Sequence, residues 1–121
     1  MLFVIPMAKF FSQYKHKSMF KAVRVQYSTK QEYTAKNKEN IQKVMSDLRE
    51  INDPGIKYGT FLSEDGKTFM HFALFENEEA QKVLNDLESF KIFQAELKAS
   101  GPEVPPKVDN LSLVGSSYDI F

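Results

Sequence analysis

The chain has 121 residues, 42% hydrophobic and 26% charged, which is typical of one globular domain. Lysine plus arginine and aspartate plus glutamate both total 16, so the basic excess of nucleic-acid-binding proteins is missing. Cysteine is absent, which excludes disulfides and thiolate sites, and two histidines, His16 and His71, are too few for a transition-metal cluster. We therefore expect a cytoplasmic domain with no metal and no cofactor, and with neither nucleic acid nor membrane as a partner.

Residues 1–18 differ in character from the rest, and we expect them to form an extension outside a folded domain at residues 19–121. Their apolar part is far shorter than the roughly 20 residues that span a bilayer. They also lack the basic start and cleavage site of a secretory signal. A tail, with Met19 as an alternative start, is the preferred interpretation, and a short amphipathic anchor is the alternative.

The first half of the domain predicts a strand followed by a helix. Residues 19–27 alternate between two faces, the period of a half-buried strand. Thr29 followed by Glu32 has the spacing of a capping box, which opens a helix. An apolar stripe continues through about 20 residues to Asn52, where Pro54 and Gly55 end the helix.

The second half predicts a hairpin. The apolar runs 56–64 and 67–76 are joined by Asp65 and Gly66, a pair that supplies the positive φ angles of a tight turn. Asn77 can cap the helix that follows, with acidic residues in its first turn.

That second helix extends to Gly101 and Pro102, with a kink expected around Glu88 and Ser89. A Pro-rich loop at 102–107 then leads to a last strand at 110–115. The order β-α-β-β-α-β predicts an α+β, ferredoxin-like sandwich, with a four-stranded antiparallel sheet and two long helices on one face.

The strand–helix junction at 75–80 (FENEEA) and the Ser89-Phe90-Lys91 segment are loose motifs. Together with the element order, they make residues 19–121 resemble the dimeric α/β-barrel superfamily, which includes antibiotic-biosynthesis and haem-degrading monooxygenases. The resemblance implies a homodimer of two sheets packed face to face, with the ligand pocket in the barrel interior. It also implies that oxidation without metal or organic cofactor is within the range of such a fold.

The haem-degrading branch is disfavoured by three replacements. Its pocket tryptophan falls on Phe75, its haem-ligating histidine on Gln94, and its first-strand asparagine near Arg24. Phenylalanine has no indole N–H, and a glutamine amide is a poor iron ligand beside an imidazole.

The resemblance also implies which side chains face the barrel interior. If Phe75 points there, alternation brings Phe69 and His71 to the same face. The intervening row, expected under the helices, is Met70, Phe72 and Leu74. On the first strand, Val23 and Val25 are expected under the helices, so that Arg24 and Gln26 face the interior.

His71 is the first candidate for an acid/base residue, because it titrates near neutral pH, and Arg24 is the candidate holder of an anion or oxyanion. The alternative for both is a structural role in the dimer interface. The candidate ligand-binding residues are Gln26, Tyr58, Phe69, Phe75 and Gln94.

Functions of two main classes stay open. The protein binds a small apolar or aromatic ligand in the barrel interior, or it is a cofactor-independent, monooxygenase-like oxidoreductase. An RNA-recognition-type module shares the element order, but residues 67–72 lack the glycines of its signature and the helices are longer.

Overall fold

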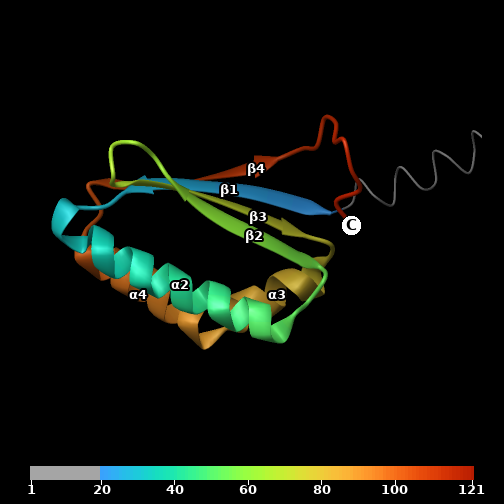
Figure 1. Cartoon of the computed structure of the whole chain (residues 1–121), viewed down its shortest axis with the longest axis horizontal. Helices are drawn as coiled ribbons and strands as arrows, with labels where there is room; N and C mark the ends of the chain where they lie inside the picture. The colour runs from blue at the N-terminus through green and yellow to red at the C-terminus, as the bar shows by residue number, and fades with distance from the viewer. Residues whose placement is uncertain (1–19) are drawn as a thin grey trace, which may run out of the picture.

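The computed structural model describes residues 20–121, so the predictions for residues 1–18 and Met19 lie outside the described part (Figure 1). The elements in chain order are β1 (Lys21–Ser28), η1 (Gln31–Tyr33), α2 (Thr34–Ile51), β2 (Ile56–Leu62), β3 (Thr68–Phe75), α3 (Glu78–Asp86), α4 (Glu88–Ser100) and β4 (Val104–Leu111).

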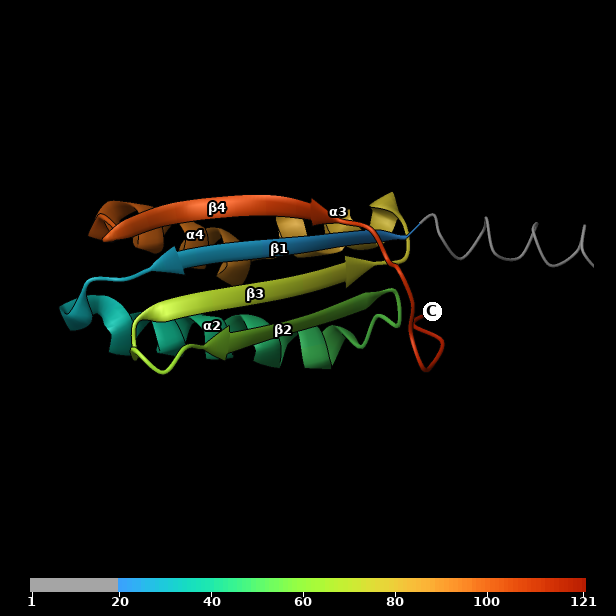
Figure 2. The ribbon, with the colours of Figure 1, turned by 90° about the horizontal axis from the view of Figure 1, so that it is seen from above.

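The strands form one antiparallel sheet in the order β2-β3-β1-β4. All the helices cover one face of this sheet and leave the other face open (Figure 1). Seen from above, α2 lies behind β2 and β3, whereas α3 and α4 lie behind β1 and β4 (Figure 2). The predicted α+β, ferredoxin-like architecture is confirmed. None of the helices among residues 20–121 is long and apolar enough to cross a membrane.

The predicted hairpin between β2 and β3 is confirmed, but its turn is wider than expected. The loop spans residues 63–67, and the Asp65 carboxylate accepts hydrogen bonds from the backbone N–H groups of Lys67 and Thr68 at 2.9 and 2.8 Å. Gly66 has a φ of 76°, whereas Asp65 is not among the described residues with positive φ. A two-residue turn of the primed type would need both.

The predicted helix ends are partly confirmed. The Asn77 side chain accepts from the Ala80 N–H at 2.9 Å and caps α3, and Asn52 ends α2 in the left-handed region at φ 54°. The kink lies at Leu87, between α3 and α4. The capping box is wrong, because η1 intervenes and the Thr29 hydroxyl instead bonds Thr34 Oγ1 at 2.8 Å.

The last strand begins earlier than predicted, at Val104 rather than residue 110. Pro105 and Pro106 had indicated a loop, since proline donates no ladder hydrogen bond. They fall where the pairing of β4 with β1 is irregular, between the Gln26 and Ser28 positions, and β4 is an edge strand. Both features make proline tolerable there.

The prediction of which β3 row faces the helices is wrong. Phe69, His71 and Phe75 are buried between the sheet and the helices, at 2%, 3% and 3% exposure. The opposite row lies on the open face and consists of Met70, Phe72 and Leu74. For β1 the prediction is right, because Val25 pairs with His71 and shares its face, whereas Arg24 pairs with Phe72.

Candidate functional site

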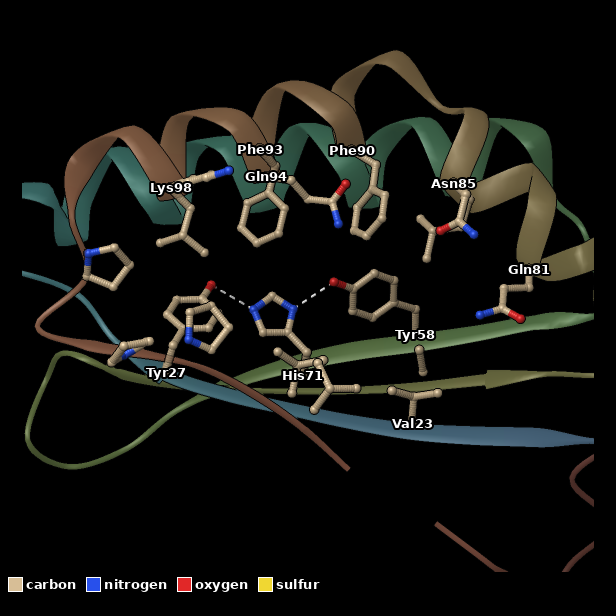
Figure 3. Close-up of a pocket in the computed structure, with 18 of the residues that line it drawn as sticks. Val23, Tyr27, Tyr58, His71, Gln81, Asn85, Phe90, Phe93, Gln94 and Lys98 are labelled. Carbon is tan, nitrogen blue, oxygen red and sulfur yellow. Dashed lines mark hydrogen bonds between the residues drawn. The ribbon is translucent and has the colours of Figure 1, made fainter. Parts of the chain in front are cut away.

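A cavity of about 610 Å³ lies between the sheet and helices α3 and α4 (Figure 3). The ligand pocket was predicted in the barrel interior, which in a face-to-face dimer would lie on the open side of the sheet. This cavity lies on the other side, under the helices, so the predicted location is wrong for it. Its floor comes from β1, β3 and the facing edge of β2, its roof from α3 and α4, and one side from β4. The lining residues on the strands include Val23, Val25, Tyr27, Tyr58, His71, Ala73, Phe75 and Val108; those on the helices include Leu84, Phe90, Phe93, Gln94, Leu97 and Lys98.

His71 stands at the centre of this site with both ring nitrogens occupied (Figure 3). Its Nε2 lies 2.8 Å from the Tyr27 hydroxyl, and its Nδ1 lies 2.7 Å from the Tyr58 hydroxyl and 3.1 Å from Thr60 Oγ1. The Asn37 side chain on α2 donates to the Tyr27 oxygen at 2.8 Å. One buried network therefore ties α2, β1, β2 and β3 together.

The direction of these bonds favours one tautomer of His71. Because Asn37 donates to the Tyr27 oxygen, the Tyr27 hydroxyl is free to donate to Nε2. A neutral imidazole that accepts at Nε2 carries its proton on Nδ1, which then donates toward Tyr58. The network is thus a chain of donors and acceptors that runs from α2 to β2.

Burial keeps every member of the network neutral at pH 7. It lowers the pKa of His71 to about 4. It also raises the pKa of the Tyr27 hydroxyl and that of the Tyr58 hydroxyl. The cavity therefore offers a neutral, hydrogen-bonding centre surrounded by apolar walls.

The low pKa of His71 predicts acid sensitivity. The pKa of His71 is about 4 in the folded state and near 6.5 in the unfolded chain, so the unfolded chain takes up a proton first as the pH falls. The contribution of neutral His71 to the free energy of unfolding is therefore complete above pH 6.5 and is lost as the pH falls toward 4. We expect about 3 kcal/mol to be lost over that interval. Urea unfolding at pH 7 and pH 4.5, in the parent and in His71→Gln, isolates this contribution; equal pH dependence in the two proteins would contradict it.

The structure brings together four of the seven predicted site residues. Tyr58, His71, Phe75 and Gln94 all line the cavity. Phe69 instead packs below it, stacked on Tyr27 with ring centroids 5.5 Å apart.

Arg24 and Gln26, the other two, lie on the open face, away from His71. Arg24 donates a hydrogen bond to Gln26 and forms an ion pair with Asp109 at 3.5 Å. The expected surface that combined Arg24, Gln26, His71 and Phe75 is therefore wrong. His71 itself is 3% exposed and lies between the sheet and the helices, not on the open face where the interface between subunits is expected.

Asn37 and Tyr27 are site residues that were not predicted from the sequence. A signal for Asn37 was present: it precedes Asn40, Ile41 and Val44 at helical spacing and is fully buried with them. An asparagine on an apolar stripe needs a buried partner, which here is Tyr27. Within residues 20–121, no group of three or more histidine, aspartate or glutamate side chains is placed to hold a metal ion.

Comparison with known proteins connects this fold to a group of small proteins. No family model and no curated protein matches the sequence. Solved structures do match. An antibiotic biosynthesis monooxygenase is 16% identical with a TM-score of 0.67, covering 80% of this chain and 100% of its own. Rv0793 from Mycobacterium tuberculosis is 14% identical with a TM-score of 0.68, covering 82% and 99%.

PA3566 from Pseudomonas aeruginosa is similar to the same degree, with 15% identity, a TM-score of 0.68, and coverage of 83% of this chain and 99% of its own. These identities are low, so the likeness concerns the fold. The chain has the ferredoxin-like fold of the antibiotic-biosynthesis-monooxygenase-like proteins, as the sequence resemblance implied.

Proposed function

We propose that the protein binds a small, flat, apolar or aromatic molecule in the cavity between the sheet and helices α3 and α4. The observation that carries this proposal is the cavity itself, whose volume of about 610 Å³ lies within the range of roughly 300–1,000 Å³ common for ligand pockets.

The shape and chemistry of the walls favour a flat aromatic ligand. Phe90 and Phe93 on α4 stack with ring centroids 5.9 Å apart, and Tyr58 meets Phe90 edge to face at 6.5 Å. His71 lies 5.5 Å from Phe93 in the same row. Aromatic rings pack most favourably against another aromatic ring, either offset-stacked or edge to face.

A cavity-filling substitution tests the proposal. Ala73 pairs with Val23 on one side and Tyr58 on the other, and it lines the cavity floor. In a fluorescence titration with N-phenyl-1-naphthylamine, we expect one binding site per chain in the parent and at least about tenfold weaker binding in Ala73→Phe.

Ala35→Phe is the matched control, because it makes the same change at an exposed position of α2 that does not line the cavity. It should bind the probe as the parent does. Parent-like binding by Ala73→Phe, or no binding by the parent, would contradict the proposal.

We also propose that the open face of the sheet is covered by a second copy of the chain. Phe61 is 61% exposed there and meets Phe72 edge to face at 6.0 Å, beside Met70 and Leu74. A contiguous apolar patch on a sheet with no helix over it is typical of an interface. A stable dimer of this kind buries about 2,000 Å² or more.

A cofactor-independent oxidation of the bound ligand is the second candidate function. The observation that bears on it is the neutral His71, which a ligand hydroxyl can approach only by replacing Tyr58 or Tyr27 as its hydrogen-bond partner. Such an exchange would put an imidazole base on the ligand. Turnover lost in His71→Gln while probe binding persists would support this candidate.

A further inference from the structure

Four polar side chains from the helices line the cavity: Gln81 and Asn85 on α3, and Gln94 and Lys98 on α4 (Figure 3). Each pair is four residues apart, so its members lie on the same side of their helix. Asn85, Gln94 and Lys98 are exposed, which places them at the mouth. Across from the helices, the wall is formed by Pro102, Pro105, Pro106 and Val108, none of which has a polar side-chain atom.

Lys98 gives this mouth its charge. Among the described residues that line the cavity, it is the one with a charged side chain at pH 7, and no aspartate or glutamate is among them. Within residues 20–121 its ammonium group makes no ion pair, whereas Lys67 is paired with Glu103 at 2.9 Å. The cavity is therefore an apolar chamber with one unpaired positive charge among the residues that line it.

Gln94 lies one turn before Lys98, and Figure 3 shows its amide pointing from α4 toward the sheet. An amide N–H donor beside an ammonium group is a suitable pair of partners for an anionic oxygen. Phe90 and Phe93 lie on the same helix and border the adjacent chamber. A flat molecule stacked against these rings would thus bring one end to Gln94 and Lys98.

From this arrangement we infer that the ligand is an aromatic acid: its ring system occupies the chamber, and its anionic group binds Lys98 at the mouth. The inference rests on the proposed ligand-binding function and adds the charge of the ligand to it. Charge complementarity supports the inference of an anionic ligand, because an unpaired ammonium group at the opening of an apolar site favours an anion over a neutral molecule of the same shape.

A different role for Lys98 must be separated from this one. It lies in the last turn of α4, where a positive charge also stabilises the helix dipole. That role would change the melting temperature, but it would not make binding depend on the charge of the ligand.

Two probes that share a ring system make the test. 1-Anilinonaphthalene-8-sulfonate is anionic, and N-phenyl-1-naphthylamine is the same ring system without the sulfonate. Both are titrated into the full chain and into its variants, and the fluorescence that Ala73→Phe abolishes is taken as cavity binding. We expect Lys98→Met to weaken sulfonate binding about tenfold and to leave the neutral probe within about twofold.

Lys98→Arg should restore sulfonate binding, because it keeps the charge. Lys91→Met is the matched control: Lys91 is exposed on the same helix and does not line the cavity, so both probes should bind as in the parent. Unchanged sulfonate binding in Lys98→Met, or equal losses for the two probes, would overturn the inference and leave the proposed function standing. Failure of both probes to bind the parent would overturn the proposed function and this inference with it.

Discussion

Replacing His71 with alanine is expected to lower the free energy of unfolding by about 3 kcal/mol. The change removes a buried imidazole and leaves the Tyr27 and Tyr58 hydroxyls without their partner at 2.8 and 2.7 Å. Each unsatisfied buried group costs about 1–3 kcal/mol, and water entering from the cavity offsets part of that cost. Urea unfolding at pH 7 measures the effect, since the imidazole is neutral there.

Two further variants make the His71 prediction specific. Tyr58→Phe removes one of the bonds and should cost about 1–2 kcal/mol. Lys38→Ala, on the exposed side of α2, should stay within about 0.5 kcal/mol. A loss below about 1 kcal/mol in His71→Ala would mean that the network does not hold the four elements together.

Phe72→Arg is expected to convert the proposed dimer into a monomer. Phe72 lies on the central strand β3 of the open face, paired with Arg24 on β1 and Gly59 on β2. An arginine there would bury a second positive charge beside Arg24 in the proposed interface. We expect the dimer dissociation constant to rise at least about 100-fold, a change of about 2.7 kcal/mol.

Sedimentation at micromolar concentration measures this change. Gln42→Arg adds the same charge to the exposed side of α2 and should leave the dimer intact. A parent that is monomeric at that concentration, or a Phe72→Arg variant that is still dimeric, would contradict the proposed interface.

The parts of the fold that the sequence predicted well depend on local chemistry. The Asn77 cap needs only a side-chain oxygen and an N–H three residues on, and the hairpin needs Asp65 and Gly66 between two apolar runs. The capping box at Thr29 failed because a competing contact, with Thr34, came from outside that pattern. The start of β4 was missed because prolines are tolerated in an edge strand but not in a central one. The sequence does not show which strand lies at the edge.

The face of β3 could not be read from its own residues. Apart from His71, both of its rows are mainly apolar, since one is buried by the helices and the other forms the open patch. The decisive fact is the register with β1, which pairs His71 with Val25 rather than with a polar residue. Register is a long-range property that the residues of β3 alone do not determine. Because side chains alternate along a strand, one wrong assignment of the β3 face placed every β3 side chain on the wrong side of the sheet.

The candidate site was only half predictable for a similar reason. His71, Tyr58, Phe75 and Gln94 were expected as site residues and do line one cavity. The partners of His71 lie on elements separated from it by 13 and 44 residues in the chain, and no short motif encodes such contacts. The burial that lowers the pKa of His71 likewise arises only when α4 and the sheet meet.

Ligand binding in the cavity is tested most directly by locating N-phenyl-1-naphthylamine in a crystal structure of its complex with the parent protein. We expect one molecule per chain between His71 and α4, with its rings against Phe90 and Phe93. We expect no ordered probe in that space in Ala73→Phe crystals grown under the same conditions. A probe bound on the open face beside Phe61 and Phe72, with the cavity empty, would contradict ligand binding in the cavity.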